Sequence, residues 1–246
     1  TYDYPSYWVG REYEHKCELI AVKALLQKIP RIDTLIEVGA GFGRITPVYK
    51  YRAKKIFLTD PSGKLLSLAR DSFKRKGLYF VHSRLERLDK KIKRRSADLI
   101  IMVRVLHHIK DVDQAFKILS KLTKKGGYLI LEFANKSNFK NMVKEFLRGN
   151  FVFPMEIDTV DKRSKKNIKK NTIPFNNYHV DYIKDRLSEA GYKIIEKRSV
   201  SNIRNSFVKN LFPTSFFLSL ANLVQPLLGY IDFGPSIFIL AKKIEE

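Results

Sequence analysis

The sequence predicts an α/β fold in which helices cover both faces of a mostly parallel sheet. Two observations lead to this prediction. Short apolar segments alternate with segments of helical periodicity over residues 31–135, which is the pattern of βαβ units. The apolar segments are also continuous runs, without the polar alternation of a strand that faces water, so both sides of each strand should be buried. A chain of 246 residues, 44% of them hydrophobic, is large enough to build such a core.

The first half of the chain has the most regular alternation. A helix is expected at Glu12–Lys28, because apolar side chains follow one face and Pro30 lies beyond its end. Buried strands are expected at Thr34–Val38, Lys55–Thr59, Leu78–His82, Asp98–Val103 and Tyr128–Phe133. A helix begins at Asp60-Pro61, and another begins at the capping box of Asp111 and Gln114 and ends at Gly126-Gly127.

The second half departs from this regular alternation. A basic helix is expected at Asn138–Arg148, followed by the loop-like segment Asn150–Asn177. That segment contains the basic run of residues 162–170, which we expect to be solvated. The expected elements after it are a helix at Val180–Ala190, a strand at Lys193–Val200, the apolar segment Phe207–Ile231 and a last strand at Ser236–Ala241.

The charge of the chain is strongly positive, with 47 Lys and Arg against 25 Asp and Glu and a net charge of +22. Such a field favours anionic partners, namely nucleic acid, an acidic membrane or a phosphorylated small molecule, although solvated surface lysines explain it equally well. Cys17 is the single cysteine, so neither an internal disulfide nor a thiolate metal cluster can form. No His, Cys or carboxylate group has metal-ligand spacing, and no metal is expected. No basic-then-apolar signal segment opens the chain, which favours the cytoplasm.

The most informative motif is a glycine loop that follows the first strand. It reads Glu37-Val38-Gly39-Ala40-Gly41-Phe42-Gly43, and glycines at such a turn let a ligand lie against bare backbone. The spacing is G-x-G-x-G, whereas the dinucleotide fingerprint would need a third glycine at Arg44, so a nicotinamide dehydrogenase is disfavoured. Asp60 ends the second strand, where it would either accept hydrogen bonds from two ribose hydroxyls or cap the following helix.

Together these segments resemble the class I S-adenosyl-L-methionine (SAM) dependent methyltransferases, particularly their type 11 small-molecule branch. The resemblance rests on Leu35–Gly43, on Asp60, on Ala97–Ile109 with its "DLI…VLHHI" pattern, and on Gly126–Glu132. It implies a Rossmann-like, seven-stranded, mostly parallel sheet. One domain is then expected, with a lid helix over residues 1–30, a SAM-binding core over 31–135, a basic insertion over 136–178 and completion of the sheet over 179–246, with an apolar helical insert at 205–231.

The resemblance also implies a set of cofactor-binding residues. Those that would hold the methionine and ribose portions of SAM are Glu37, Gly39, Ala40, Gly41, Gly43, Asp60 and Pro61, with Arg104 near the methionine end. The family often places an acidic residue after the third strand to contact adenine, but Arg84 stands there in this chain, so the backbone around Arg84 and Leu85 would replace it. A preceding helix often forms a lid in this fold, so Tyr7 or Arg11 would pair with the SAM carboxylate; the alternative is an aromatic patch on the sheet.

The acceptor is less constrained by the sequence. Candidates for a general base are His107, His108, Tyr178 and His179, and packing or capping is the alternative role for the two histidines at the fourth strand. Two nucleic-acid chemistries are disfavoured, because the chain has no [Asp/Asn]-Pro-Pro-aromatic run and no motif cysteine. We therefore expect methyl transfer to an O or N atom of a small or lipid-like acceptor. The positive charge of the chain would favour an anionic acceptor. The alternatives are an RNA methyltransferase that uses the basic insertion and a non-catalytic SAM-binding module.

The apolar segment near the C-terminus has a length that could in principle cross a bilayer, since residues 211–231 carry no charge. Pro213, Pro226 and Gly229 interrupt it, and a crossing would separate two strands that should pair in one sheet. We expect a buried helix that walls an apolar acceptor pocket. The alternative is an apolar face in peripheral contact with an anionic membrane.

Overall fold

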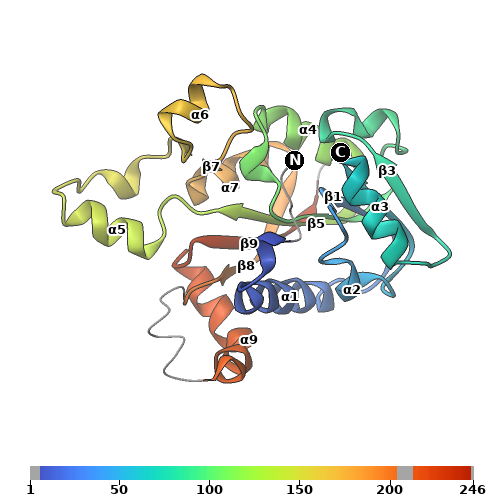
Figure 1. Cartoon of the computed structure of the whole chain (residues 1–246), viewed down its shortest axis with the longest axis horizontal. Coiled ribbons are helices and arrows are strands. Elements are labelled where there is room, and N and C mark those ends of the chain that lie inside the picture. The colour runs from blue at the N-terminus through green and yellow to red at the C-terminus, as the bar shows by residue number, and fades with distance from the viewer. Residues whose placement is uncertain (1–5, 204–212, 245–246) are drawn as a thin grey trace.

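The computed structural model describes residues 6–203 and 213–244. It contains a seven-stranded sheet in the order β3-β2-β1-β4-β5-β9-β8, with β9 antiparallel to both of its neighbours and the other pairs parallel (Figure 1). The strands are β1 (Ile32–Val38), β2 (Ala53–Asp60), β3 (Leu78–His82), β4 (Ala97–Met102), β5 (Thr123–Ala134), β8 (Tyr192–Val200) and β9 (Ser236–Lys243). The expected Rossmann-like, mostly parallel sheet is thus confirmed.

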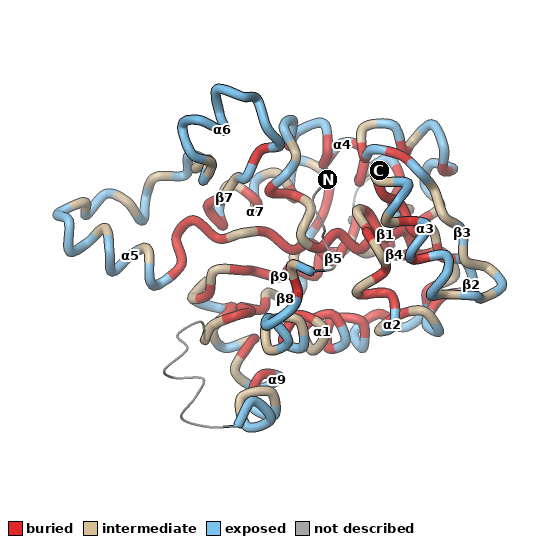
Figure 2. The backbone as a smooth tube through the Cα atoms, viewed as in Figure 1, coloured by how far each residue is buried: buried red, intermediate tan, exposed pale blue. Residues whose placement is uncertain are grey.

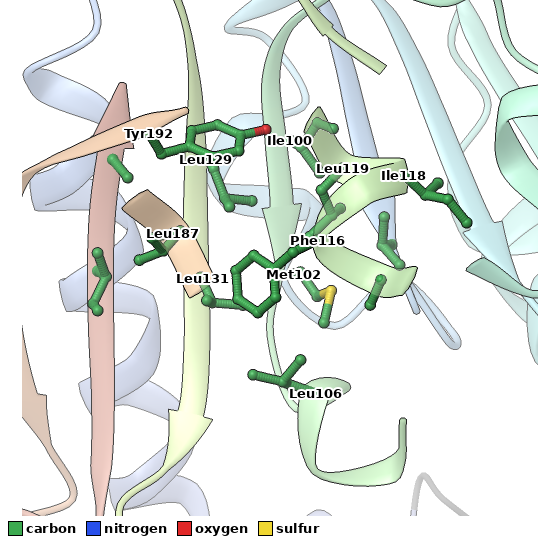
Figure 3. Close-up of a cluster of buried hydrophobic side chains, with 14 of the residues drawn as sticks. Ile100, Met102, Leu106, Phe116, Ile118, Leu119, Leu129, Leu131, Leu187 and Tyr192 are labelled. Atoms are coloured by element: carbon green, nitrogen blue, oxygen red, sulfur yellow. The ribbon is translucent and has the colours of Figure 1, made fainter. Parts of the chain in front are cut away.

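Helices cover both faces of this sheet. One face carries α1 (Glu12–Gln27), α2 (Thr46–Tyr49), α3 (Gly63–Ser72) and α9 (Thr214–Tyr230). The other carries the 3-10 helix η2 (Leu85–Lys90), α4 (Val112–Leu122) and α7 (Val180–Glu189). In Figure 3, Phe116 and Leu119 of α4 lie against Met102 and Leu131 of the sheet, with Leu187 of α7 beside them. The two apolar layers hold the strand ends, and therefore the loops after them, in fixed positions.

The capping of α4 is as expected, but its end is not. Asp111 accepts a hydrogen bond from the backbone N of Gln114 (2.8 Å), as in a capping box. The helix nevertheless ends at Leu122, and β5 begins at Thr123, which pairs with Ala97. The prediction that Gly126-Gly127 ends the helix was therefore wrong: both glycines lie inside β5. A Cβ on Gly127 would lie 2.8 Å from the carbonyl oxygen of Ala97, so Gly127 permits a close approach between the two strands.

The basic insertion projects from the body of the molecule (Figure 1) and is mostly exposed (Figure 2). Its elements are α5 (Phe139–Phe146), η4 (Phe153–Met155), β6 (Val160–Asp161), α6 (Lys165–Lys169) and β7 (Asn176–Asn177). The segment expected to be a loop therefore contains a short hairpin and two short helical elements. The four lysines of the run 165–170 are exposed, which confirms that this charge is solvated.

The C-terminal apolar segment forms α9, which is less buried than expected. Residues 204–212, where the insert begins, lie outside the described residues. Ala221, Gln225 and Gly229 are buried, whereas Leu223 and Leu227 are exposed, so the prediction of a buried helix was wrong. The reason is its place on the outside of the antiparallel edge, where only one side meets α1 and β8. In the part of the chain that the structure describes, no helix is long and apolar enough to cross a membrane.

Candidate active site

The glycine loop follows β1 at the carboxyl edge of the sheet. Gly39, Gly41 and Gly43 have φ values of 71°, 56° and 82°, in the left-handed region that favours glycine. A Cβ on Gly39 would lie 2.2 Å from Cγ2 of Val105, which follows β4. The backbone N of Ala40 donates to the carbonyl of Thr59 (2.9 Å) and ties the loop to β2. The expected loop residues therefore lie together, between the ends of β2 and β4.

Asp60 stands at the end of β2, beside this loop. Its Oδ2 accepts a hydrogen bond from the backbone N of Gly41 (2.8 Å), and its Oδ1 accepts one from the backbone N of Ser62 (2.7 Å). The cap of α3 is Ser62, whose hydroxyl accepts from the backbone N of Leu65 (3.3 Å), so a helix-capping role for Asp60 is wrong. Burial raises the pKa of Asp60, although the two hydrogen bonds act in the opposite direction and lower it. A carboxylate has about four acceptor sites, so about half of its capacity remains for a ligand.

A cleft of about 580 Å³ lies beyond Asp60, next to the end of β3. The side chains that line it are Pro61, His82, Ser83, Arg84, Glu86, Arg87 and Lys91. Pro61 and Arg84 were both expected among the cofactor-binding residues, whereas the side chain of Leu85 belongs to the apolar core beneath. Sequence analysis did not single out His82 or Lys91 for this site. The signal that could have identified them is their place at or after the end of β3, at the same edge of the sheet as Asp60.

Glu37 lies beneath the loop rather than in the cleft. Its Oε2 accepts hydrogen bonds from the hydroxyls of Tyr49 and Thr46 at the two ends of α2. Burial raises its pKa to about 7. These contacts favour the role of a solvent-shielded acid that supports the loop from below, and they leave direct contact with a cofactor as the less supported interpretation.

A buried ion group joins α1 to the carboxyl edge. Glu18 of α1 is fully buried, and its two oxygens accept from Arg44 Nη2 (2.6 Å) and Arg104 Nε (2.7 Å). Arg104 has a φ of 62°, and its backbone N donates to Glu132 of β5 (2.8 Å). Arg104 was thus correctly placed past the end of β4, but its guanidinium pairs with Glu18. Sequence reasoning did not identify Glu18 or Arg44, because neither belongs to a motif.

The N-terminal aromatic segment packs on this ion group. Trp8, in the 3-10 helix η1 (Ser6–Trp8), is buried, and the guanidinium of Arg44 lies over its ring at 3.8 Å from the centroid. Arg11 donates to the hydroxyl of Tyr7 (2.8 Å). The segment therefore covers the side of the glycine loop that faces α1, where a lid would lie.

The acceptor candidates lie past the end of β4. His107 and His108 belong to η3 (Leu106–His108), with ring centroids 4.0 Å apart. His108 Nδ1 donates to the carbonyl of Pro174 (2.8 Å), and the ring of Phe175 lies 4.9 Å from that of His107. Both contacts come from the basic insertion. Nδ1 of His107 is buried and has no hydrogen-bond partner within the described residues, and burial lowers the pKa of His107 well below its usual range.

The other two candidates have structural contacts. Tyr178 is buried, its hydroxyl donates to the carbonyl of Leu106 (3.0 Å), and burial raises its pKa to about 12. A phenol that stays protonated at neutral pH argues against a general base. His179 caps α7, because its Nδ1 accepts from the backbone N of Asp181 (3.2 Å). Of the four candidates, His107 is therefore the one with a ring nitrogen, Nδ1, that is left to bind a methyl acceptor. Within residues 6–203 and 213–244, no group of His, Cys, Asp or Glu could hold a metal ion.

Comparisons with known proteins agree with this geometry. A family model of a methyltransferase domain matches residues 36–131. A SAM-dependent methyltransferase from Thermotoga maritima, described as a possible histamine N-methyltransferase, is 19% identical, with a TM-score of 0.63 over 98% of this chain and 94% of that one. Magnesium protoporphyrin IX methyltransferase from Synechocystis, solved with bound S-adenosylhomocysteine (SAH), is 17% identical, with a TM-score of 0.57 over 94% and 83%.

A further similar structure is a complex between the Trm112 methyltransferase activator and a methyltransferase from Haloferax volcanii. The matched chain of that complex is 15% identical to this protein, with a TM-score of 0.63 over 100% of this chain and 100% of that one. No curated protein sequence matches this chain. The fold of this chain is that of SAM-dependent methyltransferases. Residues 36–131, which contain the glycine loop, the ends of β2, β3 and β4 and most of β5, match a methyltransferase domain.

Proposed function

We propose that this protein transfers the methyl group of SAM to an O or N atom of a small or lipid-like acceptor. The observation that carries the proposal is the Asp60 carboxylate, which two backbone donors hold between the glycine loop and the cleft at β3. Ribose hydroxyls are donors that the remaining acceptor sites of Asp60 would suit. The cleft lined by Pro61 and Arg84 is the place for the adenine.

The residues present fit SAM. The cofactor supplies an activated methyl group, so the protein mainly needs to align the acceptor and exclude water, and alignment alone can contribute roughly 7–11 kcal/mol. The lid role proposed for residues 1–30 is supported by Trp8, which packs over Arg44 beside the loop. The role proposed for the insertion at 136–178 is supported by Pro174 and Phe175, which contact the histidine pair.

His107 is the residue that we propose to contact the acceptor. Because its pKa lies well below the usual range, its imidazole is neutral at physiological pH. A neutral imidazole nitrogen without a partner can accept a hydrogen bond from an acceptor hydroxyl or amine and so orient it, whereas its lowered pKa makes it a weak base and argues against proton uptake. Tyr178 then acts as a positioning residue, since its hydrogen bond to the carbonyl of Leu106 holds the turn that carries His107.

The single cysteine, Cys17, is buried in α1, which agrees with the proposed reducing, cytoplasmic location.

Calorimetric titration of SAM and SAH into the wild type, Asp60→Ala and Asp33→Ala tests the cofactor site. Asp33 is the matched control, because it is a half-buried carboxylate at the opposite edge of the sheet, paired with Arg31 and Lys54. Asp60→Ala removes two hydrogen bonds to a charged group, at about 1.5 kcal/mol or more each, so it should weaken SAM binding by about a hundredfold or more. Asp33→Ala should bind SAM like the wild type. Failure of the folded wild type to bind SAM would overturn the proposal.

The acceptor is tested separately with methyl-labelled SAM. Label in the lipid or small-molecule fraction of a cell extract supports the proposed acceptor class. Label in RNA, reduced by glutamine at the exposed lysines of α6, would favour the RNA alternative. Binding of SAM without transfer to any fraction would favour a non-catalytic module.

A further inference from the structure

The helix α5 is amphipathic and has no buried residue. Phe139, Met142, Val143 and Phe146 lie at helical spacing on one face, and all four are exposed. In a globular protein such a face normally packs against the core. Here it lies on the arm that projects from the body (Figure 1), and within the described residues it stays exposed apart from the ring of Phe139, which stacks on Phe233 at the base of the arm.

The apolar surface continues into the turn after the helix. The exposed fractions are 79% for Leu147, 65% for Phe151 and 79% for Met155. The rings of Phe146 and Phe151 meet edge to face with centroids 5.1 Å apart, so the helix and the turn form one surface. We call residues 139–157 the apolar arm. A contiguous exposed patch of large apolar side chains marks an interaction site rather than ordinary surface.

The apolar arm is fixed at its base. Phe139 donates its backbone N to the carbonyl of Phe233 (2.9 Å), and the two rings stack at 4.9 Å. Nζ of Lys136, a buried residue, donates to the carbonyl of Glu156 (2.6 Å) and ties the far end of the arm back to the body. The arm starts within five residues of the end of β5, so it is anchored at the carboxyl edge that carries the candidate active site.

Positive charge flanks the apolar face. Lys140, Lys144 and Arg148 are exposed on or next to α5, and the exposed lysines of α6 follow within the same insertion. A short helix that joins Phe, Met and Val on one side to lysines on the other is the pattern of an interfacial helix on an anionic bilayer. The charge argues against a second copy, because two chains of net charge +22 would bring like-charged arms together. The exposed aliphatic side chains argue against RNA, which offers no apolar layer to bury them.

We propose that the apolar arm docks the protein on the surface of an anionic lipid bilayer, with the side chains of Phe146 and Phe151 inserted among the headgroups and the lysines on the lipid phosphates. Docking by the arm does not require the proposed function. Its consequence for the acceptor rests on that function: the bilayer would bring a lipid-like acceptor to the edge of the sheet where the candidate active site lies.

The test is cosedimentation of the full chain with vesicles of phosphatidylcholine containing phosphatidylglycerol, at low and high salt, with pure phosphatidylcholine for comparison. We expect wild-type binding to the anionic vesicles that weakens with salt. Phe146→Ser/Phe151→Ser should lower the partition coefficient at least tenfold. Lys140→Gln/Lys144→Gln should lower it by about fivefold per lysine.

Matched controls separate the arm from general surface properties. Tyr51→Ser removes an exposed aromatic residue elsewhere, and Lys121→Gln/Lys125→Gln removes two exposed lysines near the start of β5, at the other edge of the sheet. Both controls should bind vesicles like the wild type. SAM titration on the same samples reports the proposed function independently, because a protein that binds SAM but no vesicles refutes the docking alone.

Three results would overturn the proposal. The first is a folded wild type that binds no anionic vesicles. The second is vesicle binding that survives Phe146→Ser/Phe151→Ser unchanged. The third is a dimer, or RNA binding, that the arm variants abolish while the wild type ignores vesicles, since the arm would then serve a second copy or a nucleic acid.

Discussion

Substitution of Glu18 by glutamine should destabilise the protein by about 3 kcal/mol. The side chain of Glu18 is fully buried and bridges Arg44 of the glycine loop and Arg104 after β4. Glutamine keeps the volume and part of the hydrogen bonding but removes the charge. Breaking a buried ion pair by removing one partner costs about 3–5 kcal/mol, because the remaining charge has no compensation. We expect the lower end, since Glu132 lies close enough to Arg104 to favour its charged form.

The pH dependence gives the sign of the effect. Burial opposes ionisation of Glu18, but Arg104 and Arg44 hold its pKa below the ordinary value of 4.5. A carboxyl group whose pKa is lowered in the folded state stabilises the fold above pH 4.5, its unfolded-state pKa. This stability is lost as the pH falls through the lowered pKa of the folded state. The difference between wild type and Glu18→Gln should therefore be full at pH 7 and shrink in acid.

Urea unfolding followed by circular dichroism at pH 7 and at pH 4 measures this difference. Glu12→Gln, an exposed change in the first turn of the same helix, is the control and should shift the unfolding free energy by less than about 1 kcal/mol. An effect of Glu18→Gln as small as that of the control at pH 7 would refute the reasoning that the ion group holds α1 to the carboxyl edge.

Two further predictions concern the loop and its support. Gly39→Ala should cost more than about 1–3 kcal/mol, because Val105 occupies the place of the new Cβ; Gly10→Ala, with a φ of 74° and open space, should show the backbone strain alone in thermal unfolding. Burial raises the pKa of Glu37 from 4.5 to about 7, so its contribution is present below pH 4.5 and is lost as the pH rises through about 7. In the wild type, the free energy of unfolding should therefore fall by about 3 kcal/mol over this pH range, and Glu37→Gln should remove this fall. A wild-type melting temperature that stays level from pH 5 to 8 would contradict this.

The strands and the glycine loop were predictable because their signals are local. A continuous apolar run followed by glycine marks a buried strand and its end wherever the partner strands come from. The end of α4 was not predictable in this way, since pairing of Thr123 with Ala97 competes with one more helical turn. The burial of α9 was also overestimated, because an apolar composition does not reveal that only one side of a helix meets the body of the protein.

By itself, the sequence determined the chain order of the seven strands of the sheet and of the helices that cover it, the turn at Gly39 to Gly43 and the carboxylate at the end of β2. Each of these depends on residues a few positions apart. Only the tertiary structure decided that Glu18 lies between Arg44 and Arg104, that Asp60 accepts a hydrogen bond from Gly41 of the glycine loop, and that the apolar arm stays outside the core. Those features join groups up to 86 residues apart, or depend on which surface packing leaves uncovered, and neither leaves a periodic signal in the chain.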